Sequence, residues 1–196
     1  MKALQIAATG MAAQQMKVDV VSNNLANMST TGYNPRRADF ADLTYQQMAR
    51  PGTVSAADGS MLPTGIQIGL GVRPAAVSVV IGQGSLDPTG GDLDVAIDGN
   101  GYLEVQMPSG QTGYTRDGAL KRSAEGLIVT SDGYPVAPGI TIPSDARGLT
   151  ISPSGEVYAE FADRVDPELI GQLAISSFPN EKGLEAVGSN LYRETE

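Results

Sequence analysis

The acidic side chains of the second half of the chain are the residues best suited to chemistry. The segment DVAIDGNGYLE places Asp98, Asn100 and Gly101 like the middle of an EF-hand calcium loop. Aligning Gly101 with the invariant glycine of that loop puts Ala96 at the first ligand position and Met107 at the twelfth, where a glutamate belongs. An EF-hand is therefore excluded, and the segment is better interpreted as a β-turn.

Two pairs of carboxylates, Asp94 with Asp98 and Asp117 with Glu125, could in principle act in glycoside hydrolysis. Acidic residues beside glycines are mostly turn formers, and 3 Phe, 7 Tyr and no Trp provide a poor platform for stacking on sugar rings. The lack of His and Cys removes the usual general base, the thiol nucleophile and the commonest zinc ligands. We therefore predict no catalytic, cofactor-binding or metal-binding residue, and a protein that is not an enzyme.

Two further motifs carry weak signals. GLGVRP has two glycines, but it lacks the third glycine and the strand–turn–helix context of a dinucleotide fingerprint. YTRDG places Arg116 beside Asp117 at a predicted turn, where a local ion pair or a turn contact is a better interpretation than a ligand site. Neither motif predicts a small-molecule substrate.

The charge of the chain argues against a nucleic-acid partner. The net charge is −9, and the basic doublets Arg36–Arg37 and Lys121–Arg122 do not make the basic stripe that phosphate binding requires. No segment reaches the roughly eighteen apolar residues that span a bilayer. The start, MKALQIAATGMAAQQ, resembles a signal peptide only superficially, because polar residues and a glycine interrupt its apolar run. We expect no cleavage there.

The first 27 residues are predicted to form one amphipathic helix. An apolar seam follows a seven-residue repeat, with Gln14 as its polar break. The members of this seam are Leu4, Ala7, Met11, Val18, Val21, Leu25 and Met28. Because Lys2, Lys17 and Asp19 are the only ionised side chains before residue 36, an arm that packs on other helices is favoured over a helix lying on its own domain.

The stretch SNNLANMSTTGYNPRR is predicted to end this helix. Its amides can bond freed carbonyls or cross to a neighbouring helix, its small residues stop the helix, and Asn34–Pro35 forces an extended exit. Residues 37–45 could be a short helix or a strand. Residues 46–65 form a polar segment that is long for a free loop.

The rest of the chain has the alternating sequence pattern of short β-strands. Segments of alternating apolar and polar residues are separated by turn pairs typical of antiparallel hairpins. These pairs are Asp98–Gly99, Asn100–Gly101, Asp117–Gly118, Asp132–Gly133 and Ser154–Gly155. The predicted fold is mainly β, with an N-terminal α-helical arm, an extended segment and one antiparallel β domain of about eight to eleven strands.

Several long blocks, in order along nearly the whole chain, resemble the bacterial flagellar rod and hook family. They include ALQIAATGMAAQQMKVDVVSNNLANMSTTGYNPRRADFADLTYQ, LPTGIQIGLGVRP, LDVAIDGNGYLEVQMPSGQTGYTRDG and GLEAVGSNLYRET. The resemblance implies a structural subunit of the distal rod, which self-assembles helically into a rigid hollow shaft spanning the periplasm. It also implies export without a cleaved signal peptide, and neither a cofactor nor a nucleic acid as partner.

Three regions follow from the resemblance. Residues 1–28 would be a helix of the inner layer, 29–65 an extended linker with a rod-specific segment at 46–64, and 66–196 a β-rich outer domain. The family continues into a C-terminal helix that pairs with the N-terminal one, and this chain stops at Glu196. We therefore expect the arm of a lone subunit to fray or associate.

The resemblance also implies partners. These are other copies of the chain in a helical tube, the proximal rod and hook proteins, the P- and L-ring proteins, the rod cap and the flagellar export apparatus. A proximal rod or hook-type protein remains the near alternative, and a secreted β-rich carbohydrate-binding module is the alternative from another class.

Two sets of site residues are predicted. The subunit-interface residues are Leu4, Met11, Val18, Val21, Asn23, Asn24, Leu25, Ala26, Asn27, Gly32 and Tyr33. The residues of the segment predicted to stiffen the rod are Pro51, Gly52, Leu62 and Pro63.

Overall fold

A computed structural model describes residues 1–51 and 64–195 of the chain. The chain divides into two compact units, one made of Met1–Asn27 with Pro35–Val80 and the other of Met28–Asn34 with Ile81–Glu196. One N-terminal helix is followed by several small antiparallel sheets, which confirms the predicted fold class. The strand-forming residues 66–80 group with the helix, so the three predicted regions stay a prediction about the assembled protein.

The first unit begins with helix α1, Lys2–Ala26. Alanines and straight side chains favour a helix over this range, and no proline interrupts it. The helix ends at Asn27, whose backbone N–H and side-chain Nδ2 both donate to the carbonyl oxygen of Asn23, at 3.1 and 2.9 Å. The Asn23 carbonyl therefore accepts both the regular helical bond and a second hydrogen bond from the side-chain amide of Asn27.

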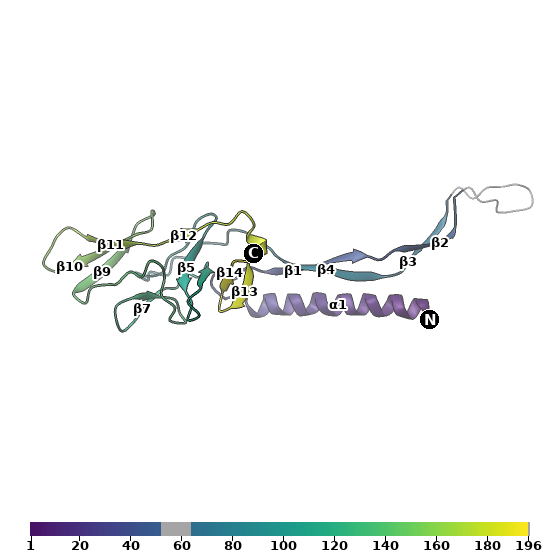
Figure 1. Ribbon diagram of the computed structural model, residues 1–196, viewed down its shortest axis with the longest axis horizontal. Helices are drawn as coiled ribbons and strands as arrows, with labels where there is room; N and C mark the ends of the chain where they lie inside the picture. The colour runs from purple at the N-terminus through teal and green to yellow at the C-terminus, as the bar shows by residue number, and fades with distance from the viewer. Residues whose placement is uncertain (52–63, 196) are drawn as a thin grey trace, which may run out of the picture. The chain divides into compact units, whose positions relative to one another are not determined.

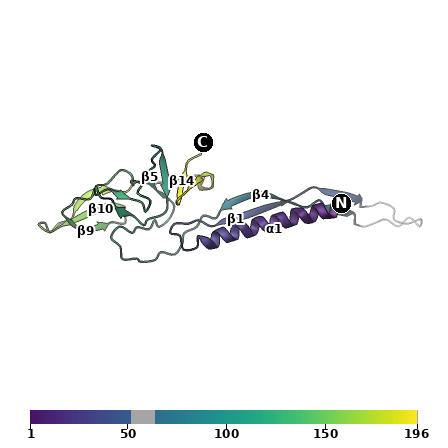
Figure 2. The same cartoon turned by 90° about the horizontal axis from the view of Figure 1, so that it is seen from below.

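A two-stranded β-ribbon completes the first unit (Figure 1). Strand β1, Arg36–Asp42, pairs with β4, Val72–Val79, and β2, Tyr45–Ala49, pairs with β3, Ile66–Gly69, all antiparallel. The bond from Leu43 N to Gly71 O, 2.9 Å, links the two pairs. Residues 37–45, left open between helix and strand, are therefore mostly strand. The β1–β4 pair runs alongside α1 in both cartoon views (Figures 1 and 2).

The second unit holds three small sheets. Two strands pair as β7–β8, three follow the order β11-β10-β9, and five follow the order β12-β5-β6-β14-β13. The strand bounds are β5 Tyr102–Gln106, β6 Thr112–Thr115, β7 Lys121–Arg122, β8 Ile128–Val129, β9 Ala146–Ile151, β10 Glu156–Phe161, β11 Glu168–Gln172, β12 Ile175–Ser176, β13 Glu185–Gly188 and β14 Leu191–Arg193. A single turn of 3-10 helix, Glu181–Gly183, precedes β13.

An aliphatic core holds these sheets together, as the scarcity of aromatic residues predicts. Its buried members come from all three sheets and from the loops between them, so small sheets that could not be stable alone share one core. They are Leu103, Val105, Leu120, Ile128, Val136, Ile140, Ile142, Val157, Leu173 and Leu191.

The predicted turn pairs divide into two groups. Ser154–Gly155 turns the β9–β10 hairpin, and Asp132–Gly133 turns the chain between Val129 and Pro135, which form a bridge. The hairpin expected at Asp117–Gly118 is wrong, because Gly118 O accepts a bond of 3.0 Å from the distant Val95 N. A Gly in a turn pair is thus not enough to predict which strands it joins.

Tyr102 gives the second unit a pH dependence at high pH. The residue is 2% exposed, and its hydroxyl donates to Glu181 Oε2 at 3.1 Å. Burial, followed by the Glu181 carboxylate, raises the pKa of Tyr102 to about 12. Because the unfolded pKa is about 10, the fold favours the neutral phenol. Its contribution to stability is complete below pH 10 and is lost as pH rises towards 12.

We expect the free energy of unfolding to fall between pH 10 and pH 12, and to fall less steeply in Tyr102→Phe. The phenylalanine variant keeps the ring in the core but has no proton to lose. Urea unfolding, followed by circular dichroism at several pH values, measures both slopes. Equal slopes for the two proteins over this range would contradict the assignment.

Candidate subunit interface

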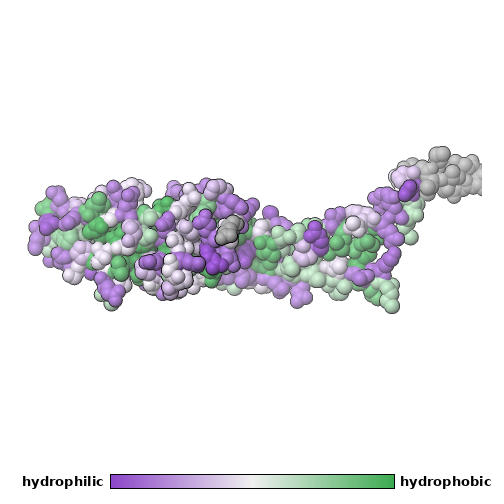
Figure 3. All heavy atoms as spheres, viewed as in Figure 1, coloured by the Kyte–Doolittle hydropathy of each residue, from purple (hydrophilic) through white to green (hydrophobic). Residues whose placement is uncertain are grey.

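The predicted seam lies on an uncovered face of α1. Its side chains at Leu4, Met11, Val18, Val21 and Leu25 are each between 54% and 73% exposed. Large apolar residues exposed singly are normal, but a row of them along one helix face is typical of an interaction surface. Apolar residues are also visible at the surface of the first unit in Figure 3.

The opposite face of α1 packs on the ribbon. Ala13 is buried, and Ile6, Met16 and Val20 are half-buried. At about 100° per residue, these positions point away from the seam. The helix therefore does pack on its own chain, as the alternative interpretation held. It does so with the face opposite the seam, whose residues are not part of the seven-residue repeat.

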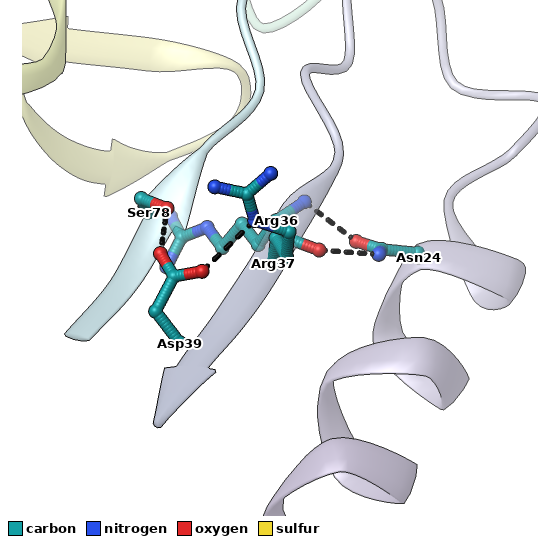
Figure 4. A network of polar contacts seen from close by, with 5 residues as sticks. All are labelled: Asn24, Arg36, Arg37, Asp39 and Ser78. Atoms are coloured by element: carbon teal, nitrogen blue, oxygen red, sulfur yellow. Dashed lines mark hydrogen bonds and ion pairs between the residues drawn. The ribbon is translucent and has the colours of Figure 1, made fainter. Parts of the chain in front are cut away.

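The predicted interface amides of Asn24 and Asn27 bond inside the chain. The side chain of Asn24 donates from Nδ2 to Arg36 O at 2.7 Å and accepts from Arg36 N at 2.9 Å with Oδ1 (Figure 4). The Asn27 amide bonds the carbonyl of Asn23 in the last turn of α1. Asn23 and Ala26 are exposed. The role of all four in subunit contacts stays a prediction, and Asn24 has a role in the chain's own fold as well.

The basic doublet at the start of β1 is not a free positive patch. Arg37 Nε lies 2.9 Å from Asp39 Oδ1, and Ser78 Oγ donates to Asp39 Oδ2 at 2.7 Å (Figure 4). Arg37 is exposed and Asp39 is half-buried near the surface, so this ion pair contributes little to stability. It does lower the local positive charge at Arg37.

Gly32 and Tyr33 belong to the second unit, where both are half-buried. Gly32 has a φ of +70°, and a Cβ at this position would lie 2.8 Å from the carbonyl carbon of Arg116. The carbonyl of Thr31 accepts a bond of 2.9 Å from Asn190 Nδ2. The glycine is therefore required by contacts within this unit. A further role in subunit contacts stays a prediction.

The YTRDG motif has a structural role that its sequence did not reveal. Arg116 donates to Gly99 O at 2.7 Å and to Gln83 Oε1 at 3.2 Å, and its guanidinium lies 5.7 Å from the centre of the Tyr102 ring. Asp117 Oδ1 accepts from Ala119 N at 3.0 Å, which confirms the predicted turn contact. Within residues 1–51 and 64–195, no ion pair joins Arg116 to Asp117. The motif ties distant loops together.

Strands β2 and β3 expose apolar residues that the sequence analysis missed. Tyr45 and Met48 on β2, and Ile66 and Ile68 on β3, are all exposed. The alternation in IQIGL is the signal that could have suggested a second apolar surface. Pro51 is exposed after β2. The other predicted stiffening residues, Gly52, Leu62 and Pro63, lie outside the residues that the structure describes.

The described part of the chain offers little for other kinds of site. It contains no cluster of three or more acidic, His or Cys residues that could hold a metal ion. Among the same residues, no helix is both long enough and apolar enough to cross a membrane. Tyr102, Tyr114, Phe178 and Tyr192 pack edge to face, with interplanar angles of 62° to 83°. Such a cluster lacks the flat, exposed platform that stacks on a sugar ring.

Two family profiles match the chain. The family described as "Flagella basal body rod protein" matches residues 4–34, which include the seam. The family described as "Flagellar hook protein FlgE/F/G D1 domain" matches residues 96–159 of the second unit. The first match lies mostly on the first unit and continues into residues 28–34 of the second, and the other match lies within the second unit.

Relatives match the chain over its length. The flagellar basal-body rod protein FlgG of Caulobacter vibrioides is 49% identical over 195 residues, which cover 100% of this chain and 74% of the relative. The FlgG of Agrobacterium fabrum is 46% identical with the same coverage. The FlgG of Bacillus subtilis is 36% identical over 199 residues, again with 100% and 74% covered.

Proposed function

Because this chain belongs to the FlgG family of flagellar basal-body rod proteins, and is a structural subunit of the rod, we propose that it builds the distal rod by packing the seam of α1 against helices of neighbouring copies. Membership confirms the family inferred from the sequence and a structural function rather than an enzymatic one. Contacts that repeat without closing into a ring generate a filament, which suits a shaft.

The exposed seam is the observation that supports this proposal. Burying one large apolar side chain contributes about 1.5 to 3 kcal/mol, and the seam presents five such side chains on one face. The few charges on α1 leave this face without repulsion between copies. A helical neighbour with a similar seam therefore matches both its shape and its chemistry.

The rod subunit is part of the flagellar basal body and assembles with other flagellar axial proteins. Its specific contacts, with further copies, the proximal rod, the hook, the P- and L-rings and the rod cap, are part of the proposal. So is export through the flagellar apparatus without cleavage. Ala13 is buried and Thr9 bonds the ribbon, so removing a leader from this end would remove the packing of α1.

The predicted regions, 1–28, 29–65 and 66–196, enter the proposal as inner helix, linker and outer domain. The pairing of Ala49 with Ile66 joins the first residues of the 46–64 segment, which lie on β2, to strand β3 just beyond the segment. The paired strands β2 and β3 give this segment a fixed base for bracing neighbouring subunits against sliding. This supports its proposed role in stiffening the rod.

Cysteine protection tests the interface, since the chain has no cysteine of its own. We would place Met11→Cys in the seam and Asp132→Cys on an exposed turn of the second unit, each in the chromosomal gene. Maleimide should label both variants rapidly in the isolated subunit. In purified basal bodies, labelling at position 11 should slow by at least about tenfold, as expected for a desolvated contact, while position 132 stays reactive. Equal labelling of Met11→Cys in both preparations would overturn the proposal.

A further inference from the structure

We propose that Thr9 and Asn24 are positioning residues that fix the rotation of α1 about its own axis, so that the seam is the face left uncovered. The functional importance of this orientation rests on the proposed function, in which the seam is the subunit interface. The geometry that carries it lies entirely within the first unit.

Asn24 binds an open strand edge. Val80 N donates to Pro35 O at 2.8 Å, so Pro35 and Val80 face each other as a hydrogen-bonded pair. In an antiparallel pair the next residue, Arg36, directs its N–H and C=O away from the partner strand. Both groups are bonded by the one amide of Asn24, at 2.9 and 2.7 Å (Figure 4). The side chain thus completes the edge of β1 as a neighbouring strand would.

Thr9 binds one backbone group, the N–H of Val72, at the edge of β4. Leu43 N donates to Gly71 O at 2.9 Å, which leaves the next residue, Val72, directed outwards. Val72 N donates to Thr9 Oγ1 at 3.4 Å, and the Thr9 hydroxyl donates to Ile6 O at 2.7 Å. Gly71 makes the approach possible, since a Cβ there would lie 2.4 Å from Thr9 Oγ1 and φ is +119°.

The two anchors together define the orientation of the helix. They are about four turns, or roughly 22 Å, apart along α1, and they hold opposite strands of the ribbon. The apolar contacts between them, at Ala13 and Met16, are non-directional and would tolerate a rotated helix. Hydrogen bonds to fixed backbone groups do not tolerate it, because their strength falls steeply with misalignment.

The test measures which face of α1 is accessible in the isolated full chain. Val18→Cys reports on the seam, where Val18 is 61% exposed, and Val20→Cys reports on the half-buried ribbon side. We expect maleimide to react much faster at position 18 than at position 20. In Asn24→Ala, the ratio of the two rates should fall by about tenfold or more, the effect of losing both hydrogen bonds to the neutral backbone groups of Arg36. Thr9→Val should act in the same direction.

Measuring the helix content distinguishes a residue that orients α1 from one that stabilises the helix itself. Alanine has a higher helix propensity than asparagine, so circular dichroism should show α1 intact in Asn24→Ala. Ser22→Ala, on the exposed side of the same turn, is the matched control and should leave the ratio unchanged. An unchanged ratio in both Asn24→Ala and Thr9→Val would overturn the inference. The inference would also be overturned if the helix content fell in parallel with the ratio of the two rates.

The outcome is independent of the proposed interface. The rate ratio concerns the isolated chain, so its failure would leave the protection expected for Met11→Cys in basal bodies untouched. If the ratio changes as expected and the Met11→Cys label is not protected, the positioning role stands and the seam is not the interface. The two proposals can therefore fail separately.

Discussion

Replacing Val18 with glutamate is expected to prevent rod assembly while leaving the isolated chain folded. Val18 is 61% exposed on α1, so a carboxylate there stays in water in the single subunit. Glutamate also has a higher helix propensity than valine. Between packed helices the same carboxylate would be buried without a partner, which costs several kcal/mol for each contact. Over many copies, this penalty should abolish the rod.

A matched substitution on the same helix separates the seam from the helix as a whole. Ala12 is exposed and lies between the seam and the ribbon face, so Ala12→Glu adds the same charge away from both. Swimming in soft agar and electron microscopy of basal bodies would compare the two strains, and circular dichroism would check the isolated chains. Normal rods built from Val18→Glu subunits would rule out the seam as the interface.

The helix and its exposed face could be predicted from the sequence because they depend on local information. The seven-residue repeat at Leu4, Met11, Val18 and Leu25 records which residues share a face, whatever lies elsewhere in the chain. The second apolar face, with Ile6, Ala13 and Met16, does not follow the seven-residue repeat, so the repeat does not indicate what covers it. Its meaning became clear only with the ribbon that covers it.

The ribbon itself could not be predicted, because its partners are far apart. Arg36 on β1 pairs with Val79 on β4. The part of the chain that connects these two strands includes the long segment at 46–64. Alternation in the sequence identifies a strand but does not say which strand will be its neighbour. Residues 66–79 group with α1 in the single chain, and their place in the predicted outer domain stays a prediction about the assembled protein.

The role of Asn24 was beyond sequence reasoning for a related reason. Amides near a helix end predict bonds to backbone groups, and this expectation is confirmed at Asn27. Asn24 instead bonds Arg36, whose outward direction depends on the register of β1 against β4. Arg116 likewise bonds Gly99 and Gln83, 17 and 33 residues away. A single sequence motif does not indicate which distant residues it will bond.

Alanine at Gly118 is expected to destabilise the second unit by about 3 kcal/mol or more, at or above the upper end of the usual cost of overpacking. A Cβ at Gly118 would lie 1.7 Å from the carbonyl oxygen of Val95 and 2.7 Å from its carbonyl carbon. The contact is with backbone, so no side-chain rotation relieves it. The local strands are also held together, since Val95 N donates to Gly118 O at 3.0 Å and Asp94 bridges to Ala119.

Gly84 provides the matched control for this prediction. A Cβ at Gly84 would meet no atom within 4 Å, so Gly84→Ala should change the free energy of unfolding little, or raise it by restricting the unfolded chain. Urea unfolding of the two variants and the unaltered chain measures the difference. Equal unfolding midpoints for Gly118→Ala and Gly84→Ala would contradict the close approach at Val95. A large difference would explain the glycine of YTRDG by backbone packing, and would place the motif among the residues that build the second unit rather than those that join subunits.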